Sequence, residues 1–203
     1  MAFLRAVAGT EPSPVVRGDG IYLRTPTLAD HGEWARLRAE SRGFLAPWEP
    51  IWPSDDLEKA AFRRRLRRYG RELREDAGYP FFLFRGHDHV LLGGLTLSNI
   101  RRGVTQACSM GYWMGERHAG QGYMANAVRA VIPYVFETLK LHRIEAACLP
   151  TNANSIHLLE KVGFQREGYA RRYLCIAGDW RDHLLYALLA EDKRPATLAN
   201  QGK

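Results

Sequence analysis

Cysteine is scarce in this sequence, and its scarcity excludes two kinds of small-protein scaffold. The 203 residues include three cysteines, at positions Cys108, Cys148 and Cys175. They are odd in number, far apart and without the C-x-x-C or C-x-x-H spacing of zinc ligands, which excludes a disulfide framework and a structural zinc centre. We therefore expect a reduced, cytoplasmic protein that holds no metal.

Long apolar runs are missing as well. No stretch approaches the roughly 20 residues that a membrane-spanning helix needs. The short apolar run near the N-terminus is interrupted by Arg5 and turns polar at Gly9, unlike a secretory signal peptide. The motifs G-x-x-x-x-G-K-[ST] and G-x-G-x-x-G are absent too, which argues against a P-loop and a dinucleotide-binding fold. We expect no contact with a membrane.

The sequence does contain enough apolar material for one folded domain. Hydrophobic residues make up 46% of the chain and aromatic residues 11%, which suits a single domain with a buried core. We assign this domain to residues 15–190, preceded by an N-terminal extension over residues 1–14 and followed by a mobile tail over residues 191–203. The formal charge of +7 either solubilises the surface or attracts an acidic partner such as RNA, an anionic cofactor or an acidic peptide.

The first third of the chain combines turn signals with helical spacing. Residues 15–24 predict a β-hairpin around a glycine-rich turn. A first helix is expected to end near Ser41. Three prolines in residues 44–53 predict a stretch without helix, and a second helix is predicted over residues 55–74 with Ser54 as its cap.

The rest of the chain predicts an antiparallel meander followed by alternating helices and strands. The predicted strands of the meander are residues 81–84, 90–97 and 105–114. They are followed by a helix over residues 123–139, a strand over 143–149, a helix over 154–162 and strands over 169–176 and 183–189. This order of elements predicts one domain without internal repeats.

A glycine-rich loop joins the meander to the helix that follows it. Residues 117–122 have the sequence R-H-A-G-Q-G and lead directly into Tyr123. The first amide groups of a helix have no intrahelical partner and carry roughly half a positive charge, so an anion binds well there. Glycines let a diphosphate approach the backbone, and Arg117 adds positive charge. The loop therefore predicts a phosphate site, although glycines at such a turn also suit a purely structural role.

The spacing R-x-x-G-x-G in residues 117–122 resembles the acyl-CoA pyrophosphate motif of the GNAT acetyltransferases. Other segments resemble the RimJ-type ribosomal-protein-alanine N-acetyltransferases of that superfamily. These segments are P-W-E-P at 47–50, N-A-N-S at 152–155, E-K-V-G-F at 160–164, E-G-Y-A at 167–170 and G-D-W-R-D-H at 178–183. The resemblance implies an α+β GNAT fold, a mixed, mostly antiparallel twisted sheet of about seven strands flanked by about four helices.

The resemblance also implies a reaction. Acetyl-CoA and a primary amine would bind together, and the amine would attack the thioester directly. The most specific acceptor that it implies is the N-terminal alanine of a ribosomal protein. The residues expected to bind acetyl-CoA are Trp113, Met114, Arg117, Ala119, Gly120, Gln121, Gly122, Tyr123 and Asn152. The backbone N–H of Met114 is the candidate donor to the oxyanion that forms on the thioester carbonyl.

One residue is the candidate hydrogen-bond donor to the departing sulfur, and two are candidates for the base. Many relatives carry a tyrosine at the position of Leu159, as the acid for the departing thiolate, so this sequence lacks that group. Ser155 is the predicted substitute, through a hydrogen bond to the sulfur, although Ser or Asn at a helix start is also a good cap. Glu145 is the candidate base, with Glu116 as an alternative. Because an α-amino group has a pKa of about 8, it loses its proton more easily than lysine by roughly 3 kcal/mol, and a water chain could replace the base.

The region between the first two helices is expected to border the acceptor. Trp48 and Trp52 would form walls of a peptide groove, and Glu49 would receive a protonated amine; packing in the core or in a lid is the alternative. The predicted second helix carries six arginines between residues 63 and 71. They form either a solvated helix face or a contact with ribosomal RNA.

Two other functions remain open from sequence alone. One is a small-molecule acetyltransferase acting on an aminoglycoside or a polyamine, which would favour an acidic acceptor cleft. The other is a CoA-binding or RNA-binding protein without catalysis, which would keep the glycine loop and need no acceptor cleft. The absence of an acidic run in the predicted acceptor loops argues against the first.

Overall fold

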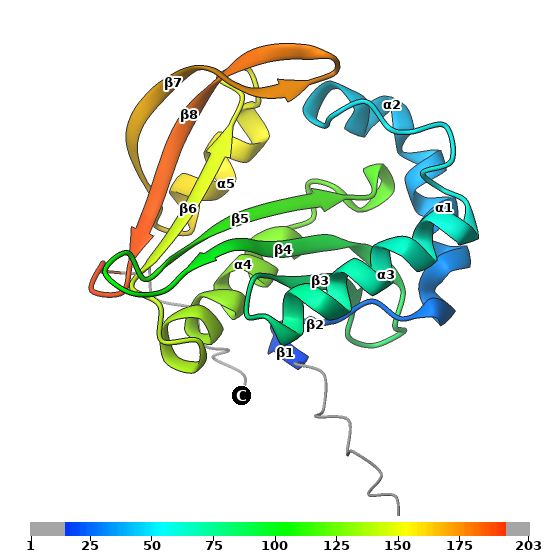
Figure 1. Ribbon diagram of the computed structural model, residues 1–203, viewed down its shortest axis with the longest axis horizontal. Helices are drawn as coiled ribbons and strands as arrows, with labels where there is room; N and C mark the ends of the chain where they lie inside the picture. The colour runs from blue at the N-terminus through cyan, green and yellow to red at the C-terminus, as the bar shows by residue number, and fades with distance from the viewer. Residues whose placement is uncertain (1–14, 194–203) are drawn as a thin grey trace, which may run out of the picture.

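An eight-stranded sheet organises the molecule (Figure 1). The computed structural model describes residues 15–193, so the predicted N-terminal extension and most of the predicted tail lie outside the described residues. The strands are β1 Val15–Gly18, β2 Ile21–Arg24, β3 Tyr79–Arg85, β4 Leu91–Arg101, β5 Ala107–Met114, β6 Arg143–Cys148, β7 Gln165–Ile176 and β8 Asp179–Leu189. Their order is β1-β2-β3-β4-β5-β6-β8-β7, and among these strands only the β5–β6 pair is parallel. The expected mixed, mostly antiparallel sheet is confirmed, with eight strands in place of about seven.

Five α-helices accompany the sheet within residues 15–193. They are α1 His31–Glu40, α2 Arg42–Leu45, α3 Lys59–Arg74, α4 Tyr123–Pro133 and α5 Ala153–Lys161. Short 3-10 turns cover Leu28–Asp30 (η1), Ala46–Trp48 (η2) and Glu116–His118 (η3), and a π turn covers Tyr134–Thr138 (η4). The helix predicted over residues 123–139 is therefore α4 continued by a π turn.

Two expectations about the segment between α1 and β3 were wrong. Residues 44–53 begin inside α2 and continue through η2, where Pro47 lies at the start of the turn and its missing N–H loses no hydrogen bond. Helix α3 begins at Lys59 rather than at residue 55. Asp55 and Asp56, which would lie in the first turn of the predicted helix, instead form ion pairs with Arg64 and Arg65.

Apolar side chains form one cluster on each face of the sheet. Helices α4 and α5 cover one face, over a core that includes Leu83 and Ile144. Helices α1 and α3 cover the other face at β3 and β4, around Trp34 and Phe62. The β7–β8 hairpin arches toward α2 at the top of Figure 1, and Ala177 in its turn bonds to Glu49, just after η2.

Strands β5 and β6 separate after a short paired stretch, and their separation creates a cleft. The register pairs residues 107–109 with residues 143–145, and no further pair joins the two strands within the described chain. Beyond Ser109, β5 continues along β4 while β6 continues along β8, so the strands diverge like the arms of a V (Figure 1). The facing edges of the two arms therefore offer backbone groups to a ligand.

Candidate active site

The glycine-rich loop lies between the end of β5 and the start of α4. Gly120 and Gly122 have φ angles of 73° and 83°, in the left-handed region that favours glycine. Ala119 ends the turn η3, Gly122 caps α4, and Tyr123 is the first residue of that helix. The bond from Asn126 N–H to the Gly122 carbonyl, at 3.1 Å, is the first of the helix, so the amides before it have no helical partner. This geometry suits the predicted anion site.

Neighbouring side chains hold Arg117 beside the end of helix α1. Its Nη1 lies 3.3 Å from Oε2 of Glu40, and its Nε donates to Nε2 of His118 over 3.1 Å. Burial first, and then the charge of Arg117, lower the pKa of His118, which favours the neutral imidazole that can accept that bond. Gln121 donates from Nε2 to the Arg117 carbonyl over 2.9 Å. Arg117 is thus held at the loop while 45% of its side chain stays exposed.

The end of β5 presents one backbone amide to the cleft. The N–H of Gly115 donates to the Leu92 carbonyl of β4 over 2.8 Å. Because successive amides of a strand point to opposite sides, the N–H of Met114 points away from β4 and toward the separated strand β6. The backbone of Trp113 faces β4 instead, and its side chain packs on the face covered by α1 and α3. Of these two residues, Met114 therefore has the orientation of a donor in the cleft.

Helix α5 begins at the open end of the cleft. Oδ1 of Asn152 accepts a hydrogen bond from the N–H of Ser155 over 3.1 Å and so caps the helix. The Ser155 hydroxyl lies 2.6 Å from the hydroxyl of Tyr112 on β5. Leu159, one turn further along α5, is fully buried. The sequence motifs do not single out Tyr112, although strand alternation from Met114 places it on the same face of β5.

Glu145 lies at the closed end of the cleft. It pairs with Ser109 in the β5–β6 register. Nε of Arg143 lies 3.0 Å from its Oε1, and Arg101 forms an ion pair with its Oε2. Tyr112 follows Ser109 by three residues on β5, which corresponds to about 10 Å along the strand. The carboxylate is therefore beyond direct hydrogen-bond reach of the Tyr112 end of the cleft and already has two guanidinium partners.

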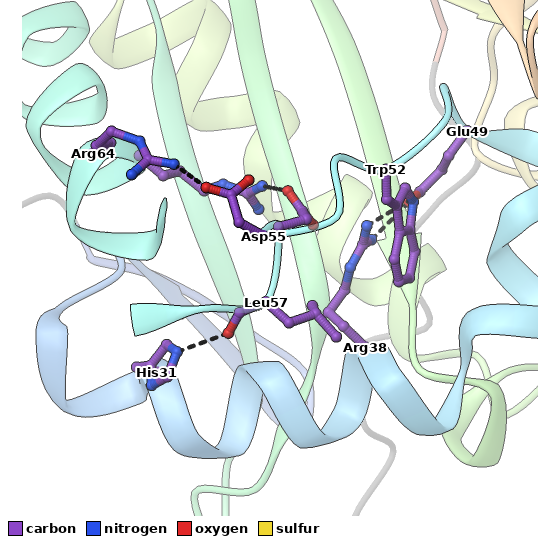
Figure 2. Close-up of polar contacts among 9 residues, drawn as sticks. His31, Arg38, Glu49, Trp52, Asp55, Leu57 and Arg64 are labelled. Atoms are coloured by element: carbon purple, nitrogen blue, oxygen red, sulfur yellow. Dashed lines mark hydrogen bonds and ion pairs between the residues drawn. The ribbon is translucent and has the colours of Figure 1, made fainter. Parts of the chain in front are cut away.

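A largely buried ion pair holds the segment between α2 and α3 against helix α1 (Figure 2). The two Nη atoms of Arg38 each lie 2.7 Å from a carboxylate oxygen of Glu49, and Nε1 of Trp52 donates to Glu49 over 2.7 Å. The Arg38 guanidinium also lies over the rings of Trp52, at 4.1 Å, and Trp113, at 5.0 Å from the centroids. Glu49 and Trp52 therefore bind Arg38, and the carboxylate expected to receive an amine already has a cationic partner.

Trp48 lines a hollow between this segment and the β7–β8 hairpin. The hollow has a volume of about 370 Å³, and its other walls are Pro47, Leu149, Thr151, Ala177 and Arg181. The N–H of Ala177 donates to the Glu49 carbonyl over 2.9 Å, which ties the hairpin tip to the segment. Because Leu149 directly follows β6, the hollow adjoins the arm of the cleft that β6 forms.

Three further features of the described residues bear on function: metal ligands, membrane-spanning helices and free thiols. The described chain holds no group of three or more His, Cys, Asp or Glu side chains that could bind a metal ion. Within residues 15–193, no helix is both long and apolar enough to cross a membrane. Cys108 and Cys148 are buried free thiols, and Cys175 is an exposed one.

Proteins of similar sequence and structure are acetyltransferases. The family model of the acetyltransferase (GNAT) domain matches residues 21–165. The [ribosomal protein uS5]-alanine N-acetyltransferase of Escherichia coli (strain K12) is 38% identical over 184 residues, which cover 90% of this chain and 95% of that protein. The probable N-acetyltransferase YjcK of Bacillus subtilis (strain 168) is 38% identical over 178 residues, with coverages of 88% and 98%. The structure of Mycobacterium smegmatis RimJ in complex with CoA-disulfide is similar, with a TM-score of 0.81, 32% identity and coverages of 88% and 87%.

Proposed function

The chain belongs to the GNAT family of acetyltransferases, and on this premise we propose that it transfers an acetyl group from acetyl-CoA to the N-terminal alanine of a ribosomal protein. The observation that carries the proposal is the junction of β5 and α4. Free helix amides, two left-handed glycines and an arginine lie there, next to the β5–β6 cleft. The activity for which the Escherichia coli relative is named supports alanine as the acceptor residue. We place this activity in the cytoplasm, where ribosomal proteins are made.

The residues present fit CoA as a ligand in two places. The pyrophosphate suits the amides at the start of α4, where Gly120 and Gly122 leave the backbone uncovered and Arg117 adds charge. The pantetheine arm suits the facing edges of β5 and β6 beyond their paired stretch, where the amides and carbonyls have no strand partner among residues 15–193. When bound, acetyl-CoA supplies an activated thioester carbonyl. In this arrangement Met114 N–H donates to the carbonyl oxygen, and Ser155 donates from its hydroxyl to the sulfur.

The acceptor amine must lose one proton before it attacks and a second afterwards. An N-terminal amine has a pKa of about 8, so a weak or distant base suffices near neutral pH. Glu145 is our candidate base, and its place at the closed end of the cleft requires that it act through ordered water.

The first residues of the acceptor enter the hollow lined by Trp48 in this proposal. The hollow adjoins the β6 arm of the cleft and combines an aromatic wall with Arg181 and Thr151. Glu49 has a different role in this proposal from the binding of a protonated amine that the sequence suggests. Its carboxylate is bound by Arg38 and Trp52, so we assign it to holding the wall rather than to receiving the amine.

Release of CoA thiol from acetyl-CoA tests the proposed acceptor. Three acceptors are compared: a peptide that begins with the alanine of a ribosomal protein, the same peptide blocked at its N-terminus, and an aminoglycoside. We expect rapid release with the free peptide and background rates with the others. Equal rates with the blocked peptide would exclude N-terminal specificity, and a preference for the aminoglycoside would favour a small-molecule enzyme. No turnover with any acceptor would favour a binding protein.

Helix α3 is our proposed contact with ribosomal RNA. Arg64, Arg65 and Arg68 have acidic partners. Arg63, Arg67 and Arg71 are exposed, and no ion pair is formed by them within the described part of the chain. A spacing of four residues puts these three on one side of the helix, so they form a stripe of unpaired positive charge that is complementary to a phosphate backbone.

The salt dependence of RNA binding tests this contact. Replacing Arg63, Arg67 and Arg71 with Gln should flatten the slope of log Kd against log salt by about 2 to 3, because each lost phosphate contact removes about 0.7 to 0.9. A matched variant replaces Arg17, Arg36 and Arg166, three exposed arginines on other elements, and removes the same net charge. Equal losses in the two variants would show that net charge, and not α3, determines RNA binding.

A further inference from the structure

Tyr112 and Ser155 meet at the open end of the β5–β6 cleft although 43 residues separate them. Tyr112 comes from the part of β5 that has already left β6, and Ser155 comes from the first turn of α5. Their hydroxyl oxygens are 2.6 Å apart. The Ser155 N–H is occupied by Asn152, so the backbone of the serine is fixed while its hydroxyl can still rotate.

The direction of this hydrogen bond determines where the Ser155 proton points. A phenol is the stronger donor of the two groups, since its ordinary pKa is about 10, whereas an alcohol oxygen has two lone pairs to accept with. Burial is the largest influence on Tyr112 and raises its pKa well above the ordinary value. The phenol therefore stays protonated and keeps a proton to donate. With Tyr112 as donor, the single proton of Ser155 is left for another acceptor.

Cys148 is the other polar group in this cluster. Burial raises the pKa of its thiol to about 11, and a hydrogen bond from Ser155 acts in the opposite direction with smaller effect. The thiol is therefore neutral, and a neutral thiol is only a weak acceptor. It does not compete strongly with an anionic sulfur for the Ser155 proton.

We propose that Tyr112 is a positioning residue, whose phenol donates to Ser155 Oγ and thereby turns the Ser155 hydroxyl proton toward the sulfur of the thioester in the cleft. This inference rests on the proposed acetyl transfer. The amine nitrogen bonds to the carbonyl carbon, and the carbonyl π electrons move to the oxygen that Met114 N–H faces. When the carbon–oxygen double bond forms again, the carbon–sulfur bond breaks and its electron pair goes to sulfur. Ser155 stabilises that charge by a hydrogen bond, strengthened by the bond it accepts from Tyr112. The proton that finally neutralises the sulfur comes from water, and the amine proton leaves to water or Glu145.

The pH dependence of CoA binding tests the role of Tyr112 without turnover. A hydrogen bond to the thiolate makes CoA bind more tightly as pH rises through the pKa of its thiol. Titration calorimetry between pH 7 and pH 10 should show this tightening for CoA and not for desulfo-CoA, which has no thiol. We expect Ser155→Ala and Tyr112→Phe to remove most of it. Tyr134→Phe is the matched control, because Tyr134 is a partly buried tyrosine whose ring packs on Tyr79 and Phe81.

Steady-state kinetics supply a second and independent readout. Tyr112→Phe should lower kcat by about tenfold with little change in the KM for acetyl-CoA, as expected for loss of one hydrogen bond in a charged network. The double variant with Ser155→Ala should be no slower than Ser155→Ala alone, because Tyr112 acts through Ser155. Independent, multiplying losses would contradict the inference.

These measurements separate the role of Tyr112 from the proposed function. If acetyl transfer occurs and Tyr112→Phe keeps both kcat and the pH-dependent tightening of CoA binding, the positioning role is wrong and the function stands. If no amine is acetylated while the tightening depends on Tyr112 and Ser155, the function is wrong and the hydrogen-bond arrangement stands. A change in Tyr134→Phe equal to that in Tyr112→Phe would assign the effect to packing and overturn the inference.

Discussion

Leu159 is fully buried, so the position where the family resemblance suggests a tyrosine contributes to the core of this protein. The hydroxyl groups that we propose to act on the sulfur belong instead to Ser155 and Tyr112, which lie in contact with each other. The motif N-x-x-S makes Ser155 predictable from sequence. Tyr112 is not predictable in the same way, because its partner is distant in the chain and the contact depends on how far β5 and β6 separate.

At Glu145 a substitution distinguishes a base from a structural carboxylate. We expect Glu145→Gln to lower kcat/KM for an alanine-starting peptide by about tenfold at pH 7, where most of the amine is protonated. The loss should shrink toward pH 9, because an amine with a pKa of about 8 is then mostly neutral. The measurement is a pH profile of kcat/KM. Glu116→Gln, at the exposed alternative position in the turn η3, is the matched control.

The two roles give different profiles. A loss that is the same at every pH would show that Glu145 has a structural role through its ion pairs with Arg101 and Arg143. Water would then accept the proton of the amine. If Glu116→Gln shows the pH-dependent loss expected for Glu145→Gln, then Glu116 is the base.

Among the elements, the succession of strands along the chain and the α4 and α5 helices are predictable because their apolar periodicity and glycine signals are local. The start of α3 is not. Asp55 and Asp56 have the composition of a helix start, yet their side chains bind Arg64 and Arg65 nine residues later. The turn η2 is also difficult to predict from sequence, because a proline such as Pro47 is excluded from the interior of a helix but suits its first position.

The turn into α4 depends on Gly122, and its replacement by alanine tests this. A φ of 83° costs a residue with a Cβ roughly 1–2 kcal/mol. We expect Gly122→Ala to lower the free energy of unfolding by about that amount and to weaken acetyl-CoA binding by about tenfold, since the loop amides would turn away from the anion. Urea unfolding and titration calorimetry measure the two effects. Gly32→Ala, in helix α1 with open space around it, should leave binding unchanged and stability equal or higher.

The junction of β2 and η1 has a pH-dependent ion pair. The side chain of Asp30 accepts bonds from Arg24 at 2.6 and 2.8 Å and from Thr27 N–H at 2.6 Å. Burial is the largest influence and opposes ionisation, but these bonds together outweigh it and lower the pKa of Asp30. The folded state therefore binds this proton more weakly than the unfolded state, so the stabilisation is present above about pH 4 and is lost as pH falls through the lowered pKa.

Asp30→Asn should consequently destabilise the protein in a pH-dependent way. We expect it to reduce the free energy of unfolding by about 1–3 kcal/mol at pH 7, with a difference from the wild type that shrinks below about pH 4. Urea unfolding at several pH values measures this difference. Asp19→Asn, in the exposed β1–β2 turn, should change stability by less than about 0.5 kcal/mol. A deficit in Asp30→Asn that grows toward acid would contradict a lowered pKa for Asp30 in the folded state.

For the molecule as a whole, Arg38 and Glu49 connect the two sides of the site. The Arg38 guanidinium lies over the rings of both Trp52, in the segment between α2 and α3, and Trp113 of β5. Trp113 immediately precedes the proposed oxyanion donor. The Glu49 carbonyl binds Ala177 at the tip of the β7–β8 hairpin. The sequence predicts Glu49 beside the acceptor but does not identify Arg38, because a bidentate pair between α1 and a later segment is a product of packing.

Glu49→Gln should therefore affect stability and acceptor binding together. The side chains of Arg38 and Glu49 are 7% and 20% exposed, and Nε of Arg38 is buried without a hydrogen-bond partner in the described residues. Removing the carboxylate leaves this guanidinium uncompensated, so we expect a loss of about 2–4 kcal/mol in the free energy of unfolding. The KM for the acceptor peptide should rise more than that for acetyl-CoA, because the wall of the hollow loosens. Urea unfolding and steady-state kinetics measure both.

Two further variants test whether the uncompensated charge of Arg38 causes the loss of stability in Glu49→Gln. Arg64→Gln breaks the exposed pair with Asp55 and should cost less than about 1 kcal/mol. Combining Glu49→Gln with Arg38→Met removes the buried charge itself, so the double variant should recover part of the stability lost in Glu49→Gln. A double variant less stable than Glu49→Gln would show that the contacts of Arg38 with the rings of Trp52 and Trp113, rather than its charge pairing, hold the segment between α2 and α3 to β5.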